Sequence, residues 1–135
     1  MITKKTWAGW AASAAVGTLV ASAPPASAEP TLHGCVYPRV CFYQTEAQYT
    51  AGSPTAAYQD PDYNQTLGPR SKGADVVYNS RNDDTVLLRI GSTSTAFCLD
   101  PNSTVHNDAS VTVTAIRIRS NPATCSSIFV TWPSS

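Results

Sequence analysis

The stretch "GCVYPRVCFYQ" (residues 34–44) holds two of the chain's four cysteines, six positions apart, and runs into β-branched and aromatic residues. That composition predicts a β-strand over residues 40–44, entered through a turn at Pro38-Arg39. Two cysteines at this spacing could form a metal clip, a redox pair, a substrate-mimicking loop or a disulfide staple. The compartment that the chain reaches separates these possibilities.

Residues 1–28 are typical of a secretory signal peptide. Lys4 and Lys5 precede an apolar run over residues 7–23, which is followed by the small-residue triplet Ala-Ser-Ala at positions 26–28. The run is short for a transmembrane helix, which needs about 20 residues. We therefore expect cleavage after Ala28 and secretion of residues 29–135 as a single β domain. An uncleaved membrane anchor is the alternative.

All four cysteines lie in the expected mature chain, at Cys35, Cys41, Cys98 and Cys125. An even number of cysteines in a small exported chain indicates disulfides. Three pairings are open, and we favour Cys35–Cys41 with Cys98–Cys125 because the first pair closes a hairpin-sized loop. The C-x₅-C spacing differs from that of zinc sites, and no C-x-x-C redox motif occurs. We expect no metal and no cofactor.

The mature chain carries seven basic and nine acidic residues, so its formal charge is −2. It has no basic cluster, which excludes nucleic acid and anionic membranes as expected partners. His33 and His106 belong to no catalytic motif such as G-x-S-x-G or H-E-x-x-H. We interpret both as solvated loop residues and expect a monomeric protein that is not an enzyme.

Seven short runs have the composition of strands and are separated by clusters of Gly, Pro, Asn, Asp and Ser. No helical periodicity is sustained after Ala28. The chain therefore predicts an all-β fold, a compact antiparallel β-sandwich of seven or eight strands. The runs cover residues 40–44, 55–59, 75–79, 84–90, 95–100, 110–120 and 127–132.

Two of these runs predict finer detail. In residues 84–90, Val86, Leu88 and Ile90 share one face, which indicates a half-buried strand. In "VTVTAIRIR" (residues 111–119), the apolar alternation changes phase between the valines and the isoleucines. One strand cannot bury both sets on one face without an extra residue. We therefore predict a β-bulge or a crossing between sheets near Ala115.

Two acidic clusters resemble parts of calcium sites. "DPDYNQ" (residues 60–65) begins like an EF-hand loop, but Gln65 and Ser71 replace its required glycine and glutamate. "RNDDTV" (residues 81–86) places two aspartates next to an asparagine. We interpret both clusters as polar turns.

The loop closed by Cys35 and Cys41 supplies the candidate binding residues. A rigid exposed loop can enter a protease cleft at low entropic cost, because it is ordered before binding. Pro38 and Arg39 stand at its tip and are the predicted contacts. The alternative is that they only form the turn into the following strand.

The opening of the mature chain resembles a known family. Its pattern of cysteine, short turn, V-C-[LF]-[YW], later aromatic and glycine resembles the small secreted actinobacterial peptidase inhibitors of the Streptomyces metalloproteinase inhibitor type. "SRNDDTVLLRI" and "FCLDPNS" are similar to later segments of that family. The matching positions are Cys35, Val40, Cys41, Phe42, Tyr43, Tyr49 and Gly52.

The resemblance implies a β/γ-crystallin-like Greek-key fold and the function of a secreted peptidase inhibitor. We expect tight binding of a pre-organised loop to an extracellular protease of the metallo or serine type. The alternative is a non-inhibitory extracellular module that binds a cell-surface glycan or a secreted protein. For that function, Tyr58, Tyr63 and Trp132 are the aromatic candidates.

Overall fold

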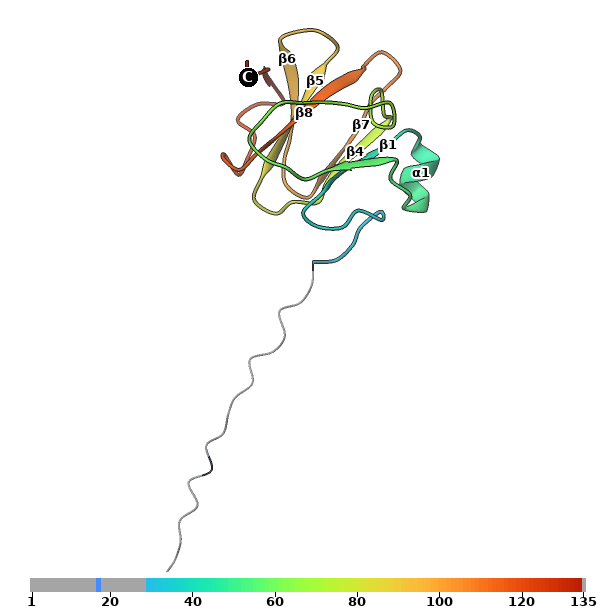
Figure 1. The fold of residues 1–135 in the computed structure, drawn as a ribbon, viewed down its shortest axis with the longest axis vertical. Helices are drawn as coiled ribbons and strands as arrows, with labels where there is room; N and C mark the ends of the chain where they lie inside the picture. Colours follow the sequence, from blue (N-terminus) through green and yellow to red (C-terminus); the bar gives the residue numbers. More distant parts are fainter. Residues whose placement is uncertain (1–16, 18–28, 135) are drawn as a thin grey trace, which may run out of the picture.

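The computed structural model describes residue 17 and residues 29–134 (Figure 1). The expected signal peptide, apart from residue 17, lies outside this range. The described chain forms two antiparallel β-sheets of four and five strands, with one short helix and two disulfides. The antiparallel β architecture is confirmed. Among the described residues, no helix is long and apolar enough to cross a bilayer.

Nine strands and one helix make up the described part of the chain, and seven strands coincide with predicted runs. β3 and β7 were missed, because both lie among turn-forming residues. The elements are β1 Val40–Tyr43, α1 Glu46–Ala51, β2 Ala56–Tyr58, β3 Gln65–Thr66, β4 Val76–Asn79, β5 Thr85–Ile90, β6 Thr95–Leu99, β7 Ser103–His106, β8 Val113–Arg119 and β9 Phe129–Thr131.

The two sheets exchange strands. The first sheet has the order β2-β1-β4-β7 and the second has the order β3-β8-β5-β6-β9. β3 belongs to the first half of the chain, β1 to β4, but it pairs with β8 in the second sheet. β7 belongs to the second half, β5 to β9, but it pairs with β4 in the first sheet. Each half of the chain thus places its third strand in the other half's sheet, so each complete sheet contains strands from both halves.

Helix α1 corrects the expectation of an all-β chain. Six residues are too few to display a helical period, but the end signals are present. Thr45 and Gln48 form a capping box, and Gly52 ends the helix in the left-handed conformation. The segment before Cys35 lies against this end, where a Cβ on Gly34 would be 1.9 Å from the Gly52 carbonyl oxygen. Only glycine fits at position 34.

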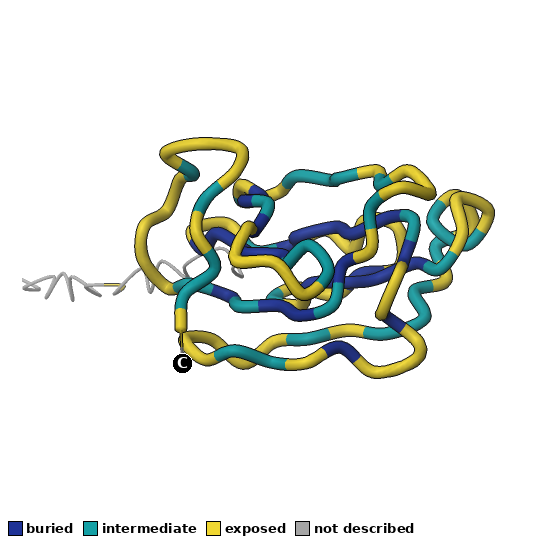
Figure 2. The backbone as a smooth tube through the Cα atoms, turned by 90° about the horizontal axis from the view of Figure 1, so that it is seen from above, coloured by how far each residue is buried: buried dark blue, intermediate teal, exposed yellow. Residues whose placement is uncertain are grey.

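The main core lies between the sheets and contains most of the apolar residues predicted for it, but Ile90 at the end of β5 is only half-buried. Val86 and Leu88 from β5 meet Phe42 from β1 and Val77 from β4 there. Figure 2 shows the buried backbone in the middle of the molecule and exposed backbone in most of the connecting loops. Burial between the sheets supplies the main hydrophobic stabilisation.

The predicted irregularity in residues 111–119 is confirmed as a register shift between β5 and β8. Arg89 pairs with Ala115, but the next residue, Ile90, pairs with Val113, so Thr114 is the extra residue. The extra residue turns both Val113 and Ile116 into the core, where they are 1% and 0% exposed. The change of phase in the sequence therefore located the bulge to within one residue.

The prediction of a half-buried strand over residues 84–90 is wrong. The outward-facing Thr85 and Leu87 are 0% and 1% exposed, because the C-terminal segment covers this face of the second sheet. Cys125 and Trp132 pack there beside Leu87. The alternation in the sequence predicted which residues of β5 face the core. It did not predict that another segment covers the residues on the opposite face.

The outer face of the first sheet is covered in the same way, by the segment before β1 and by Tyr49 of α1. A disulfide fixes each terminal segment to its sheet, Cys35–Cys41 on the first and Cys98–Cys125 on the second. This is the favoured pairing. The loops span 6 and 27 residues, for which chain entropy gives about 2 and about 3.5 kcal/mol.

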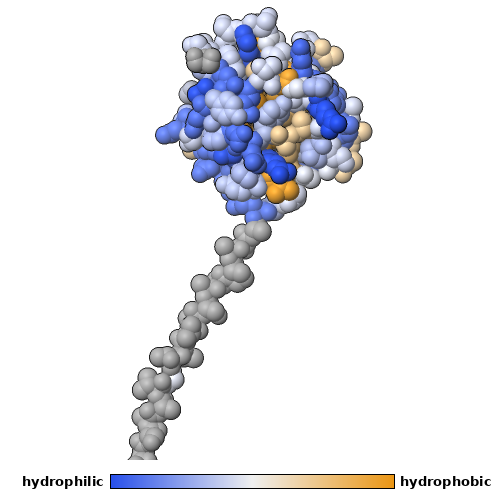
Figure 3. Space-filling view, viewed as in Figure 1, coloured by the Kyte–Doolittle hydropathy of each residue, from blue (hydrophilic) through white to orange (hydrophobic). Residues whose placement is uncertain are grey.

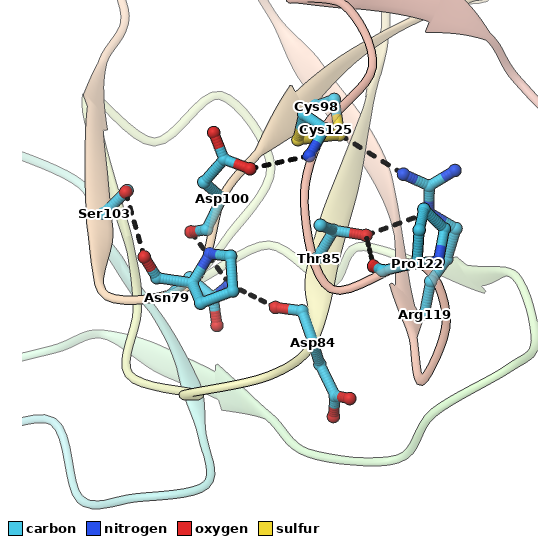
Figure 4. The surroundings of a disulfide bond; sticks show 10 residues. Asn79, Asp84, Thr85, Cys98, Asp100, Ser103, Arg119, Pro122 and Cys125 are labelled. Atoms are coloured by element: carbon cyan, nitrogen blue, oxygen red, sulfur yellow. Dashed lines mark hydrogen bonds between the residues drawn. A yellow bond between two sulfur atoms is a disulfide. The ribbon is translucent and has the colours of Figure 1, made fainter.

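Asn79, at the end of β4, is fully buried and joins three segments. Its side-chain amide donates to the carbonyl oxygens of Asp84 at 2.9 Å and Asp100 at 3.1 Å. Its own side-chain oxygen accepts from the backbone N–H of Arg81 at 3.1 Å. Figure 4 shows Asn79 between the chain segments that carry Asp84 and Asp100.

Replacing this residue should be costly. Asn79→Ala leaves two carbonyl groups and one N–H group without their partner, and we expect the free energy of unfolding to fall by about 2–4 kcal/mol. Urea denaturation of the oxidised protein measures it. The matched control is Asn82→Ala, an exposed position where about 0.5 kcal/mol or less is expected. Equal losses in the two variants would contradict the role assigned to Asn79.

Candidate functional site

Four loops gather at one end of the sandwich, which we call the stapled end. Residues 36–39 precede β1, and residues 80–84 connect β4 to β5. Residues 100–102 connect β6 to β7, and residues 120–128 connect β8 to β9. The strand pairing brings these strand ends together. Both disulfides lie at this end, since Cys41 follows the start of β1 and Cys98 precedes the end of β6. The chain is thus covalently restrained at the end where these loops gather.

The predicted binding residues form a tight turn at this end. The Arg39 N–H donates to the Val36 carbonyl at 3.0 Å, and the Arg39 carbonyl accepts from the backbone and hydroxyl of Ser80. The Pro38 carbonyl accepts from the Arg81 guanidinium at 2.7 Å. The backbone of the turn is therefore held from behind, as expected for a turn that enters β1. The Arg39 side chain is exposed and Pro38 is half-buried.

Residues 120–128 form the longest of these four loops. The sequence predicted a turn over its first residues and a strand over residues 127–132. Every residue of this loop is exposed except Cys125, which is half-buried. Near its end, Ile128 is 63% exposed and the following Phe129 is 58% exposed. Large apolar side chains at such exposure are typical of interaction surfaces when they cluster.

The loop is exposed but held at several points. The Pro122 carbonyl accepts from the Thr85 hydroxyl at 3.0 Å, and the Cys125 N–H donates to the Asp100 carboxylate at 2.7 Å (Figure 4). The Ile128 carbonyl accepts from the Cys98 N–H at 2.8 Å. Together with the Cys98–Cys125 disulfide, these bonds fix the middle and the end of the loop.

Asp62 holds the start of the loop. Its carboxylate accepts from the Ser120 N–H at 3.1 Å and from the Ser120 hydroxyl at 2.6 Å. These two hydrogen bonds, with smaller contributions from the Arg117 and Arg81 charges, lower the pKa of Asp62 below its ordinary value. The ionised carboxylate is thus the form that anchors the loop.

The acidic clusters act as turns in the structure. Asp62 binds Ser120, whereas Asn64 donates to the Pro133 carbonyl and accepts from Arg117, so the two side chains diverge. Asp84 pairs with Arg81. Within residues 29–134, no three His, Cys, Asp or Glu side chains are grouped so that they could hold a metal ion.

The two histidines are exposed, as predicted, but His106 is the last residue of strand β7 and not a loop residue, and neither ring is free of contacts. The His33 ring stacks on Tyr49 with the centroids 4.0 Å apart, and the His106 ring meets the same tyrosine edge-on at 5.4 Å. His106 Nδ1 lies 2.6 Å from a Glu46 carboxylate oxygen. The Tyr49 hydroxyl lies 2.9 Å from His33 Nε2 and 3.2 Å from the Thr104 hydroxyl. These contacts bind the N-terminal segment and β7 to α1.

No known protein family, curated protein or solved structure matches this chain. The surface itself is therefore the guide to function. Figure 3 shows that hydrophilic residues cover much of the visible face, with smaller apolar patches between them.

The anchoring of the loop by Asp62 predicts a dependence on pH. Because the folded pKa lies below the ordinary value, the anchor is complete above the ordinary pKa and is lost as the pH falls through the lowered one. At pH 7, Asp62→Ala should raise the amide exchange rate of Ser120 about tenfold or more. Asp60→Ala is the control and should leave it unchanged. Equal exchange in both variants would show that Asp62 does not hold the loop.

Proposed function

We propose that this protein is a secreted peptidase inhibitor and that residues 120–128 enter the cleft of the target enzyme. The observation that carries the proposal is the combination of exposure and restraint in this loop. It is exposed at eight of its nine positions, yet it is held by a disulfide and by the bonds of Asp62, Thr85, Asp100 and Cys98.

Restraint matters because a flexible loop in a peptidase cleft behaves as a substrate. A loop that is already ordered loses little conformational entropy on binding, so more of the contact energy appears as affinity. If its backbone is cut, the disulfide and the side-chain bonds keep the two new ends near each other. The enzyme then stays occupied, and the chain needs no catalytic group of its own.

Ile128 gives the loop an apolar end, and the exposed Phe129 follows it as the first residue of β9. Side chains of this kind suit the apolar subsites that many endopeptidases use to select their substrates. The partner is therefore an extracellular endopeptidase, of the metallo or serine type, with a preference for apolar residues. The turn at residues 36–39 lies at the same end, linked to the loop through Asn79, and Arg39 provides a second contact.

The order of the strands supports the crystallin-like, Greek-key assignment that accompanies this function. In a Greek key the fourth strand returns to lie beside the first. β4 lies beside β1, and β8 lies beside β5. In each half of the chain, the fourth strand pairs with the first and the third strand joins the other sheet. Two Greek-key motifs in one domain would have this arrangement. The two disulfides are consistent with an oxidising, extracellular compartment.

The test is a titration of the oxidised residues 29–135 against a panel of metallo- and serine endopeptidases. We expect loss of activity of at least one enzyme at near-stoichiometric inhibitor. Ile128→Ser should then weaken inhibition about tenfold or more, because it removes an apolar anchor. Arg39→Ala should have a smaller effect, of about threefold. Unchanged enzyme activity across the whole panel would contradict the function.

A second comparison tests the restraint. The double variant Cys98→Ala/Cys125→Ala should be cut within residues 120–128 by the target enzyme and should lose inhibition with time. The double variant Cys35→Ala/Cys41→Ala removes the other staple and serves as the matched control, with residues 120–128 still intact. If both variants are equally resistant to cleavage, the Cys98–Cys125 disulfide is not what protects the loop.

A further inference from the structure

The outer face of the second sheet carries a groove away from residues 120–128. One hollow of about 510 Å³ lies between β3 and the C-terminal segment, and a second of about 440 Å³ continues toward the turn after β5. The two share Thr66, Arg89 and Ala115, so they form one open groove, which we call the sheet groove. Each half has the size of an ordinary ligand site, about 300–1,000 Å³.

The cross-strand register explains the floor of the sheet groove. Thr66 pairs with Ala115, and Ala115 pairs with Arg89, so three adjacent strands place these residues in one row. Ala115 is small, and it lies between two longer side chains. The floor is therefore low at its centre and raised on both sides.

The C-terminal segment builds one wall. The backbone N–H of Trp132 donates to the Ser94 carbonyl at 2.7 Å, and the Pro133 carbonyl accepts from the Asn64 side chain at 2.8 Å. These bonds hold the half-buried Trp132, which lines the groove and packs against the apolar cluster of Leu87 and Ala96. The indole is thus a fixed aromatic edge.

The remaining lining is polar and positively charged. Hydroxyl groups come from both halves of the groove, and the two cations are Arg89 and Lys72. No aspartate or glutamate is among the described residues that line it, although the chain has as many acidic as basic residues. The hydroxyl-bearing residues are Thr66, Ser92, Ser94, Thr112, Thr114 and Ser134.

Arg89 is oriented by its own turn. Its Nε and one terminal nitrogen donate to the carbonyls of Thr93 and Ser92 at 2.9 and 3.0 Å. A guanidinium has five N–H donors, so three are left for a ligand. Two bonds from the turn fix the plane of the group, which favours bidentate binding of a carboxylate or sulfate.

From these features we propose that the sheet groove binds an acidic oligosaccharide, one that carries carboxylate or sulfate groups. The indole of Trp132 packs on the apolar C–H face of a sugar ring, while the threonine and serine hydroxyls exchange hydrogen bonds with its hydroxyl groups. Arg89 and Lys72 bind the acidic substituents. This proposal does not rest on the inhibitor function, since no residue of the loop 120–128 lines the groove.

A saccharide fits the groove better than an acidic peptide. The groove is shallow and rich in hydroxyl groups, and among its described lining residues the one aromatic side chain is the half-buried Trp132. An acidic peptide of equal charge has no sugar ring whose C–H face could pack on the indole of Trp132. Of the other aromatic candidates, Tyr58 is half-buried with its hydroxyl bonded to Ser71, and Tyr63 lies outside the groove.

Calorimetric titration of oxidised residues 29–135 tests the proposal, with a galacturonic acid hexamer, a neutral glucose hexamer and a hexaglutamate peptide as probes. We expect binding of the acidic saccharide at least tenfold tighter than of either other probe, and weaker binding in higher salt. Trp132→Ala and Arg89→Gln should each weaken it about tenfold. Tyr63→Ala and Arg70→Gln change an aromatic and a cation outside the groove and should bind as the unchanged protein does.

Amide chemical shifts give a readout that does not depend on the stability of the variants. Addition of the acidic hexamer should move the signals of Thr66, Thr114 and Ala115 and leave those of residues 120–128 in place. The proposal is overturned if no saccharide binds at millimolar concentration, if the neutral hexamer or the peptide binds equally well, or if the shifts map elsewhere. Each of these results leaves the inhibitor function untouched, and failure of inhibition leaves this proposal untouched.

Discussion

The side-chain amide of Asn79 is the interaction on which the stapled end depends. It lies in a place that water does not reach, and it supplies the hydrogen bonds that the Asp84 and Asp100 carbonyls need. Asp100 in turn holds the N–H of Cys125, while the neighbouring Arg81 holds the turn at Pro38. Asn79 therefore helps to position the two loops that the disulfides restrain, residues 36–39 and 120–128.

The local pattern of residues was enough to predict most of the fold. The seven strand runs and the bulge near Ala115 follow from alternation and turn chemistry, which are properties of neighbouring residues. β3 and β7 were missed because they lie among turn-forming residues, and α1 was missed because six residues cannot establish a helical period. The burial of Leu87 was missed for another reason, since it depends on a segment about 40 positions later that crosses the sheet.

The candidate site was only partly predictable. The sequence located the turn at Pro38 and Arg39, because a proline between paired cysteines is a local signal. It did not indicate residues 120–128, because their anchors come from Asp62, Thr85 and Asp100, which are distant in sequence. In the sequence alone, an apolar residue such as Ile128 looks like part of a buried strand. Its exposure becomes visible only when the packing of the neighbouring strands is known. The sheet groove likewise requires the register of three strands and the course of the C-terminal segment.

The central claim is that residues 120–128 form the surface that meets a peptidase. The most direct measurement is amide hydrogen exchange of the protein alone and in the presence of an endopeptidase that it inhibits. The account predicts new protection in residues 120–128 and a smaller increase in residues 36–39, with no change in α1 at the opposite end. Protection confined to α1 or to the sheet groove, with residues 120–128 exchanging as in the free protein, would contradict it.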